Sequence, residues 1–429
     1  MINLSRLTGI SFFKSRGLLW VGGVNVLEKL IHLSTFLGLS LWLVPEDYGV
    51  FALAWVLIAI GDSFFGLGSA FGYMRERENP KAKEIFNGAA FLFAAFWSTL
   101  CVIAGCIIFL WGAKEVGQIV CFLAIPFICR GFTYGCATTF ALNQNYRLMS
   151  TFQLAPALLG GVAGIFTAIE GGGVWALVIR YIVAGIAGCF VIAFLSPYTH
   201  RILIDIERIV LWLRDGWKLA VSNNIGWLVV YQIEQVVIGA AMGPAILGLY
   251  NFARKPADIA GQVLDQVGKQ FFLPHYIREA SSSLQAVKSA LLLALVCALG
   301  ALCIMVVAEF LLINFWSESW LPVAALLPVS LLLIPLAAID NAFKSFLAAA
   351  GDSSKILSVT IFSSILSVFL LFACVQMGLG VVYILWAAIL SMLIKVILSM
   401  YFVLKVKVGS PNECEPKGFI QAHADAGEG

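Results

Sequence analysis

Twelve stretches of the sequence are each long and apolar enough to cross a lipid bilayer, and together they use most of the chain. About 20 apolar residues span the hydrocarbon core as a helix, which bonds all its backbone polar groups internally. We therefore predict an all-α polytopic membrane protein with about twelve transmembrane helices and no soluble domain. The expected spans are residues 17–44, 49–72, 86–112, 117–137, 150–170, 174–195, 214–242, 247–272, 287–314, 321–349, 355–378 and 380–404.

The composition agrees with lipid as the main solvent. Charged residues make up 12% of the chain, against about 25% in a soluble domain. A net charge of +3 gives no reason to expect a nucleic-acid partner. The cysteines are predicted to be packing residues, and no phosphate-loop, metal-ligand or catalytic motif is found. We predict no metal, no cofactor and no catalytic residue.

The basic residues set the expected topology. With the N-terminus inside, 17 of the 27 lysines and arginines fall in inside segments, and the outside segments hold only Lys114. Lysine and arginine concentrate on the cytoplasmic side of membrane proteins. Both termini are therefore predicted to be cytoplasmic. The polar segment 406–429 is predicted to be a disordered cytoplasmic tail.

The chain also carries the signs of an internal repeat. A shift of 199 residues aligns Pro45 and Gly49 with Pro244 and Gly248, and Asn25 with Asn224. We predict two pseudo-symmetric six-helix lobes, residues 1–205 and 206–405. Six is an even number of spans, so the lobes keep the same orientation, with their axis along the membrane normal. The alternative is a chance similarity between apolar segments.

Polar side chains line one face of three predicted helices. In the eighth span they recur at intervals of four and three residues, which places them on one helical face. A stripe of this kind cannot face lipid, so we predict a hydrated cavity shared by the two lobes. The stripe of the eighth span is Asn251, Lys255, Asp258, Gln262, Asp265 and Lys269, flanked by Arg254. The seventh span presents Asn224, Trp227, Tyr231, Glu234 and Gln235, and the first presents Asn25, Glu28, Lys29, His32 and Thr35.

Basic groups outnumber acidic groups at membrane depth, which predicts an interior that attracts anions. The alternative for any one residue is a structural ion pair, such as Asp340 with Lys344, or Glu28 with Lys218 or Arg254. The basic residues are Lys29, Arg130, Arg180, Lys218, Arg254, Lys255, Lys269, Lys344 and Lys395. The acidic residues are Glu28, Asp62, Glu234, Asp258, Asp265 and Asp340.

Four segments resemble polysaccharide flippases of the Wzx type, in the multidrug/oligosaccharidyl-lipid/polysaccharide (MOP) exporter superfamily. They are residues 43–54, 141–147, 247–253 and 271–276. The resemblance implies a MOP/MATE-like fold and alternating access across a bacterial inner membrane. It implies a cargo of undecaprenyl-pyrophosphate-linked oligosaccharide, moved from the cytoplasmic to the periplasmic leaflet for O-antigen of lipopolysaccharide, capsule or exopolysaccharide. The membrane charges match no single subfamily pattern.

Combining the charges with this resemblance gives a set of candidate residues. Arginine suits bidentate phosphate contact and lysine acts as a point charge, while Trp227 and Tyr231 could stack on sugar rings. The predicted cargo-binding residues are Asn25, Lys29, Arg180, Asn224, Trp227, Tyr231, Asn251, Arg254, Lys255, Gln262 and Lys395. Asp62, Glu234 and Asp258 are predicted to carry a coupling proton or sodium ion. The expected protein is a monomer with a polysaccharide polymerase and chain-length proteins as possible partners.

Two other functions stay open on the sequence. A multidrug or small-molecule exporter of the same superfamily would need an acidic, cation-attracting cavity, which the charge count disfavours. A membrane-embedded enzyme would need a sizeable outside loop or a cytoplasmic catalytic domain. The predicted outside loops have only about four to eight residues, shorter than most functional loops. We therefore predict that the chain is not an enzyme.

Overall fold

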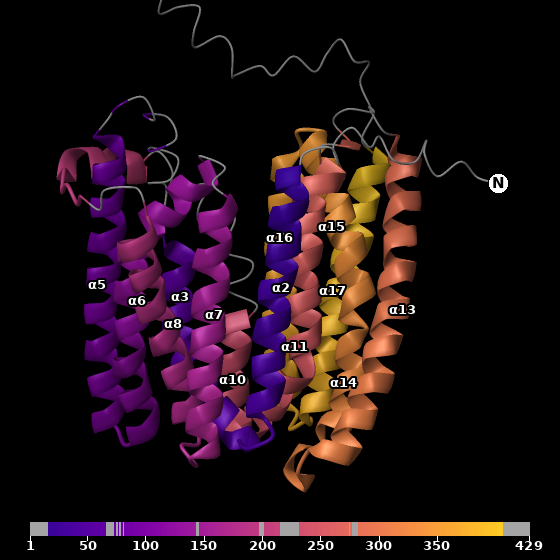
Figure 1. The fold of residues 1–429 in the computed structure, drawn as a ribbon. Helices are drawn as coiled ribbons and strands as arrows, with labels where there is room; N and C mark the ends of the chain where they lie inside the picture. Colours follow the sequence, from indigo (N-terminus) through magenta and orange to yellow (C-terminus); the bar gives the residue numbers. More distant parts are fainter. Residues whose placement is uncertain are drawn as a thin grey trace, which may run out of the picture. The chain divides into compact units, whose positions relative to one another are not determined.

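The computed structural model describes residues 16–65, 73, 76, 79, 81–142, 146–196, 201–214, 231–273, 275–276 and 282–405. Within these ranges the chain consists of long helices joined by short connections (Figure 1). The predicted all-α membrane class is therefore confirmed. The predicted tail, residues 406–429, lies outside the described residues.

The helices follow the predicted spans closely. Of the seventh span, 214–242, the structure describes residue 214 and residues 231–242. Nine helices of the described part are long and apolar enough to cross a membrane; α2 and α11, which carry polar stripes, are not among them. The elements are α2 (Arg16–Leu39), α3 (Pro45–Phe64), α5 (Ala82–Leu110), α6 (Lys114–Leu142), α7 (Tyr146–Ile169), α8 (Trp175–Leu195), α10 (Ile233–Met242), α11 (Pro244–Val267), the π-helix η3 (Gly268–Phe272), α13 (Ser283–Phe315), the short η4 (Glu318–Trp320), α14 (Val323–Leu331), α15 (Leu333–Ala349), α16 (Ser353–Gln376) and α17 (Val381–Lys405).

The tenth predicted span, 321–349, contains a break that the hydropathy pattern does not reveal. Helix α14 ends at Leu331 and α15 begins at Leu333. Pro335 lies four residues after Leu331, and a proline ring clashes with the carbonyl four residues before it and cannot bond to it. The single crossing is thus built from two helical pieces.

The chain divides into two compact units. The first comprises Met1–Ala253 and Glu309–Leu326, and the second comprises Arg254–Ala308 and Leu327–Gly429. These units are defined by compactness in space, which does not test a sequence repeat. The predicted lobes 1–205 and 206–405 therefore stay a prediction.

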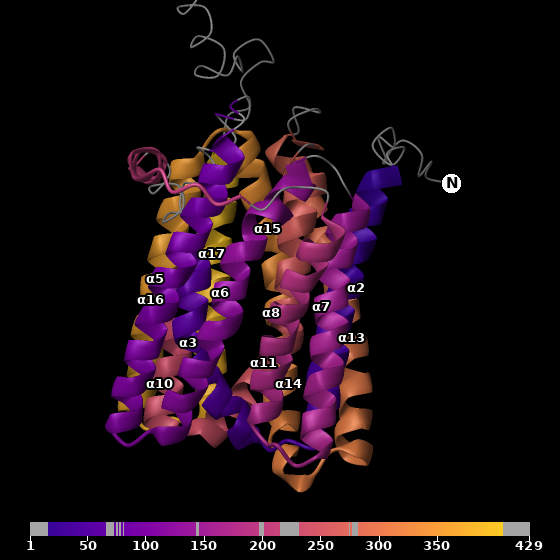
Figure 2. The same ribbon diagram turned by 60° about the vertical axis from the view of Figure 1, so that its left-hand side comes forward.

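The first unit is built around two helical hairpins. Helix α5 packs along α6 and α7 along α8, and both pairs lie side by side in the two views (Figures 1 and 2). Helix α6 also packs on α8, α2 on α7, and α3 on α6. Small and branched residues such as Ala94, Ile119 and Leu123 are fully buried where these helices meet. Large apolar side chains such as Phe96 and Phe166 point outwards, as lipid-facing positions require.

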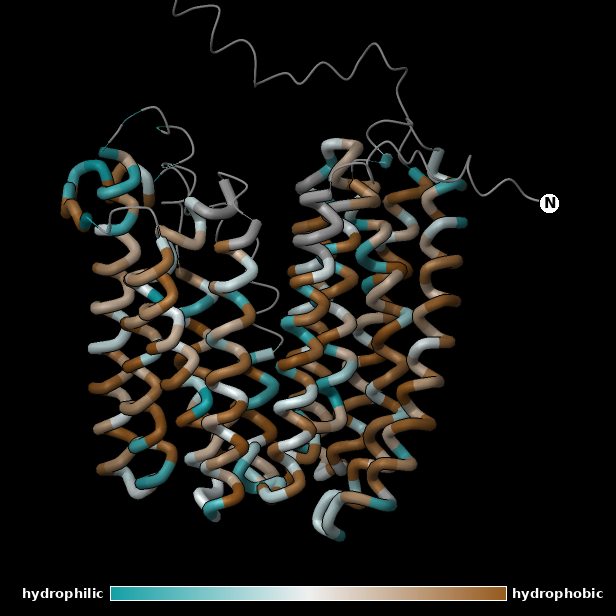
Figure 3. The backbone as a smooth tube through the Cα atoms, viewed as in Figure 1, coloured by the Kyte–Doolittle hydropathy of each residue, from teal (hydrophilic) through white to brown (hydrophobic). Residues whose placement is uncertain are grey.

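The second unit packs α15 and α16 against α17, with η3 resting on α15. Its core includes Ala290, Phe343 and Val403, and the exposed side of α13 is lined with leucines and valines. Hydrophilic positions interrupt the otherwise hydrophobic tubes of several long helices well away from their ends (Figure 3). Polar residues at membrane depth are costly, so these positions are candidates for a functional site.

Candidate functional site

The first polar cluster lies inside the first unit, where α2, α7 and α8 meet. The guanidinium of Arg180 on α8 is buried and donates from Nη2 to Nδ1 of His32 at 2.9 Å. Nε2 of His32 lies 3.5 Å from Oε1 of Glu28, one turn earlier on α2. Gln153 on α7 donates to the side-chain oxygen of Asn25 at 3.4 Å. The cluster, called the Arg180 cluster below, thus draws polar groups from three helices.

Two glycines of α7 let α8 lie close enough to form this cluster. A Cβ on Gly160 would stand 2.5 Å from the carbonyl oxygen of Arg180, and a Cβ on Gly164 would stand 3.0 Å from the Cβ of Arg180. The Gly-x-x-x-Gly pair is therefore a packing motif, as small residues are in membrane helices generally. Within the described part of the chain no acidic side chain pairs with Arg180. A buried cation that pairs with no carboxylate attracts anions.

Two acidic residues proposed as ion carriers are engaged within the first unit. Asp62 on α3 forms an ion pair with Arg130 on α6, with Oδ1 and Nη1 2.6 Å apart. Glu234 on α10 is buried and accepts a short hydrogen bond from the hydroxyl of Tyr250 on α11. The first contact joins α3 to α6, and the second joins the consecutive helices α10 and α11. The ion-carrying roles of Asp62 and Glu234 stay predictions.

Helix α11 carries the predicted polar stripe without interruption up to Val267. Lys255, Asp258 and Asp265 are half-buried and Gln262 is exposed. Arg254, which flanks the stripe, is buried, and its Nε lies 3.3 Å from Oδ1 of Asp258. This face of α11 therefore combines one ion-paired cation, Arg254, with polar side chains that are at least partly accessible. Its role in cargo binding stays a prediction.

A second cluster lies within the second unit, and we call it the Asp340 triad. Asp340 on α15 is fully buried, and its Oδ2 lies 2.6 Å from Nζ of Lys344 and 3.0 Å from Nζ of Lys395 on α17. The predicted pair of Asp340 and Lys344 is confirmed, and Lys395 joins it from another helix. The three groups carry a formal charge of +1.

At one end of the first unit the two Pro-x-x-x-Gly turns pack against each other reciprocally. A Cβ on Gly49 would collide with the carbonyl of Pro244, and a Cβ on Gly248 would collide with the carbonyl of Pro45. A twofold relation between repeats predicts reciprocity of this kind. Only glycine permits so close an approach of two backbones.

Aromatic side chains surround these turns, which are both predicted to lie outside. Trp320 donates from Nε1 to the carbonyl of Leu43 at 3.1 Å, and its ring centroid lies 5.4 Å from that of Tyr48 and 4.4 Å from that of Phe252. Trp316 donates to the hydroxyl of Ser40 at 2.5 Å. Three predicted outside connections thus meet at this end.

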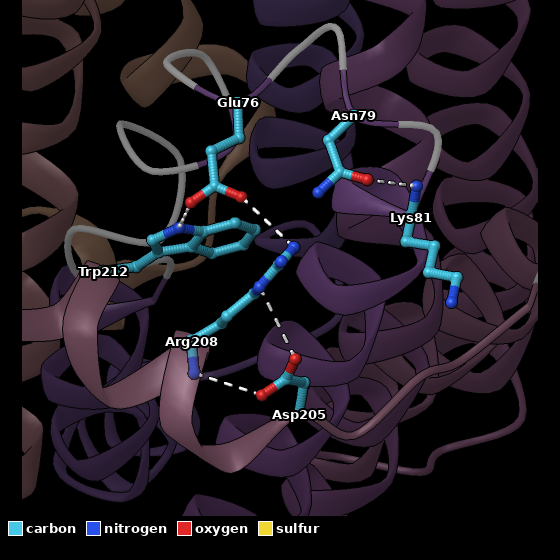
Figure 4. Close-up of polar contacts among 6 residues, drawn as sticks. All are labelled: Glu76, Asn79, Lys81, Asp205, Arg208 and Trp212. Carbon is cyan, nitrogen blue, oxygen red and sulfur yellow. Dashed lines mark hydrogen bonds and ion pairs between the residues drawn. The ribbon is translucent and has the colours of Figure 1, made fainter.

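Two of the predicted inside segments meet in a third polar cluster (Figure 4). Glu76 accepts from Nε1 of Trp212 at 2.9 Å and from Arg208 at 3.4 Å. Arg208 also contacts Asp205, which accepts from its backbone N–H at the start of helix 206–214. The backbone N–H of Leu203 donates to the carbonyl of Glu84 at 3.0 Å. Segment 201–214 is therefore fixed to the first turn of α5 and to the connection before it.

The family is shown by comparison with known proteins. A family model described as "Polysaccharide biosynthesis protein" matches residues 39–325. The chain belongs to this polysaccharide biosynthesis family. The succinoglycan biosynthesis transport protein ExoT of Rhizobium meliloti (strain 1021) is 25% identical over 230 residues, which cover 52% of this chain and 45% of that protein. The chain thus matches less than half of that relative's length.

Solved structures show the fold of this family member. The lipid II flippase MurJ in an inward closed conformation aligns with a TM-score of 0.63 at 14% identity, covering 89% of this chain and 88% of that one. An inward-facing multidrug resistance MATE family transporter of the MOP superfamily aligns with a TM-score of 0.55 at 16% identity, covering 89% and 97%. The MATE-like fold expected from the sequence is confirmed, and the family model places the chain in a polysaccharide biosynthesis family, as the resemblance implied.

The structure places the predicted site residues of this polysaccharide biosynthesis protein in several groups. Asn25 and Lys29 lie on α2, and Arg180 is tied to the same helix through His32. Asn251, Arg254, Lys255, Asp258 and Gln262 share α11, and Lys395 belongs to the Asp340 triad. Tyr231 lies two residues before α10, and Asn224 and Trp227 lie outside the described residues.

The predicted cargo-binding and ion-carrying residues contact several side chains outside those two sets. They are Glu28, His32, Arg130, Gln153, Tyr250, Asp340 and Lys344. The sequence did indicate His32, because it lies on the polar face of the first predicted span. Among the residues described by the structure, no three histidine, cysteine, aspartate or glutamate side chains gather as a metal site.

Proposed function

We propose that this protein is a flippase for polyprenyl-pyrophosphate-linked oligosaccharide. The observation that carries the proposal is the buried guanidinium of Arg180, which forms no ion pair with a carboxylate among the described residues, in a chain that belongs to a polysaccharide biosynthesis family. A pyrophosphate offers pairs of terminal oxygens that can accept two parallel hydrogen bonds from the fork of an arginine. Burial strengthens such a contact, because the local dielectric constant is lower than that of water.

The cargo would be held by basic and polar groups of several helices. Lys29 and Asn25 on α2 and Lys255 and Gln262 on α11 are at least partly accessible and can supply donors beside Arg180 and Arg254. Lys395 contributes because its triad has one more positive than negative charge. Trp227 and Tyr231 would stack on sugar rings, while the apolar polyprenyl tail would remain in lipid.

The protein would work in a bacterial inner membrane with both termini in the cytoplasm. The distribution of basic residues supports this orientation, with Lys114 alone in the outside segments. Cargo would then move from the cytoplasmic to the periplasmic leaflet by alternating exposure of the binding groups to the two sides. A proton or sodium ion carried by Asp62, Glu234 or Asp258 could drive the cycle, and a polysaccharide polymerase would use the product.

The test is the double variant Arg254→Ala/Lys255→Ala in the native organism. We expect surface polysaccharide to be lost while the protein remains in the membrane at its normal level. The matched control is Lys81→Ala/Lys114→Ala, which removes two exposed lysines from helix starts and connections. That control is expected to export normally.

Normal polysaccharide in the Arg254→Ala/Lys255→Ala strain would remove these residues from the mechanism. Drug resistance that is lost in the same strain, with polysaccharide unchanged, would favour the multidrug exporter instead.

A further inference from the structure

The Arg180 cluster contains a titratable group whose protonation state follows from its neighbours. A guanidinium carries only hydrogen-bond donors, so Nδ1 of His32 must offer its lone pair to Nη2 of Arg180 at 2.9 Å. In a neutral imidazole the other nitrogen then carries the proton. Nε2–H of His32 accordingly faces the carboxylate of Glu28 at 3.5 Å. The geometry assigns the neutral Nε2–H tautomer to His32.

A proton added to this imidazole can bind only at Nδ1, the atom that accepts the hydrogen bond from Arg180. Once Nδ1 carries a hydrogen, it can no longer accept, and the imidazolium and the guanidinium repel each other. Glu28 stabilises the imidazolium through Nε2–H, so the proton has a counter-charge while Arg180 loses its partner. Imidazole is the side chain that ordinarily changes charge between about pH 5 and 8.

We propose that Glu28, His32 and Arg180 form a proton-binding site that is linked to anion binding. A proton on His32 releases the buried guanidinium of Arg180 to an anionic ligand of the phosphate or pyrophosphate class. Because linkage is reciprocal, binding of the anion to Arg180 also favours uptake of the proton. This inference rests on the proposed function for the identity of the anion and adds a second ligand, the proton, at residues outside the predicted ion carriers.

The surroundings of His32 in the first unit support this sequence of events. Helix α2 contributes Glu28 and Lys29, and α8 contributes Arg180 and Tyr181, whose ring lies 5.6 Å from the guanidinium carbon of Arg180. Helix α7 contributes the uncharged Gln153, which donates to Asn25. Glu28 is therefore the acidic group that faces His32 among the described residues of this unit, and Arg180 is the cation that protonation displaces.

The test measures binding of inorganic pyrophosphate to the full-length protein in nanodiscs at pH 5.5 and at pH 8. The matched variants are His32→Asn and His275→Asn. The amide oxygen of Asn can accept from Arg180 in place of Nδ1 but cannot take up a proton. His275 is exposed and serves as the control.

The wild-type protein and His275→Asn are expected to gain about tenfold more affinity on acidification than His32→Asn does, which is a common size for coupling between two sites. Comparing variants removes the titration of pyrophosphate itself. If His32→Asn is not folded, Glu28→Gln replaces it and is expected to reduce the gain, because the imidazolium loses its counter-charge.

Two results would overturn the inference and can be told apart from failure of the proposed function. Equal pH dependence in wild type and His32→Asn, with tight binding in both, would refute the linkage and leave the cargo intact. No pyrophosphate binding by the wild type at any pH would refute both. Nitrogen NMR of labelled histidine adds an independent check: a proton on Nδ1 of His32 at pH 8 contradicts the assigned tautomer.

Discussion

Arg180 in the first unit and Lys395 in the second are both basic groups withdrawn from water among apolar helices, yet they are held in different ways. Arg180 is bonded to a neutral imidazole and is positioned by the glycines of α7. Lys395 shares the buried carboxylate of Asp340 with Lys344. A cation fixed by packing therefore keeps its full charge available for a ligand, while two cations that share one carboxylate keep only part of theirs. We expect substitutions in the two places to differ most in their effect on the free energy of unfolding.

The largest effect is expected for Asp340→Asn. The variant removes the fully buried carboxylate that Lys344 and Lys395, whose side chains are 35% and 14% exposed, share. Breaking a buried ion pair typically costs about 3–5 kcal/mol. Thermal unfolding of the detergent-purified protein measures the loss. The matched control is Asp352→Asn, which breaks a 2.6 Å pair with Lys355 that is partly exposed and should cost at most about 1 kcal/mol. Equal losses in the two variants would mean that burial does not decide the strength of the triad.

A smaller loss is expected for Gly160→Ala. The new methyl group would press on the carbonyl of Arg180 and on Ala184, and overpacking of this kind costs about 1–3 kcal/mol. Gly23→Ala is the control, because nothing lies within 4 Å of its added Cβ. If both variants unfold alike, close packing of α7 on α8 does not position Arg180.

Arg180→Gln should separate function from stability. The amide of Gln can still donate a hydrogen bond to His32. The free energy of unfolding should therefore change by only about 1 kcal/mol, the contribution of one hydrogen bond. Export of surface polysaccharide should nevertheless be lost, because the charge is gone. Immunodetection of the protein in membranes, together with polysaccharide staining, makes the comparison. Full export by Arg180→Gln would show that the charge of Arg180 is dispensable.

The smallest effect on unfolding is expected for Lys395→Gln. Lys344 still neutralises the charge of Asp340 in this variant, so a neutral ion pair replaces the triad of net charge +1 in the second unit. The free energy of unfolding should stay within about 1 kcal/mol of the wild type, because no buried charge is left unpaired. Export should fall in part if the extra charge meets the cargo. A loss of stability as large as that of Asp340→Asn would mean that Lys395 is mainly structural.

The sequence predicted the helices well because transmembrane helices are specified locally. Spans 117–137 and 174–195 became α6 and α8 with nearly the expected bounds. The periodic stripe on α11 follows from the helical repeat alone, and so does the pair of Asp340 and Lys344 four residues apart. Each of these features depends on neighbours along one helix.

Contacts between helices could not be predicted in the same way. The bonds from Arg130 to Asp62, from Arg180 to His32 and from Lys395 to Asp340 join helices that are far apart in the chain. A single sequence gives the charge that needs a partner but not the packing that selects one among several. The break between α14 and α15 at Leu332 was not predicted for another reason. The hydropathy is unchanged across it, and only Pro335 indicates it.

We propose that this protein moves a lipid-linked, pyrophosphate-bearing oligosaccharide by means of buried basic groups. The most direct measurement follows a fluorescent undecaprenyl-pyrophosphate oligosaccharide across the bilayer of proteoliposomes containing the full-length protein or Arg180→Gln. We expect the wild-type protein to make the labelled lipid accessible to a membrane-impermeant quencher on the far side, and Arg180→Gln to leave it on its original side. Equal rates in wild-type, Arg180→Gln and protein-free liposomes would contradict the account.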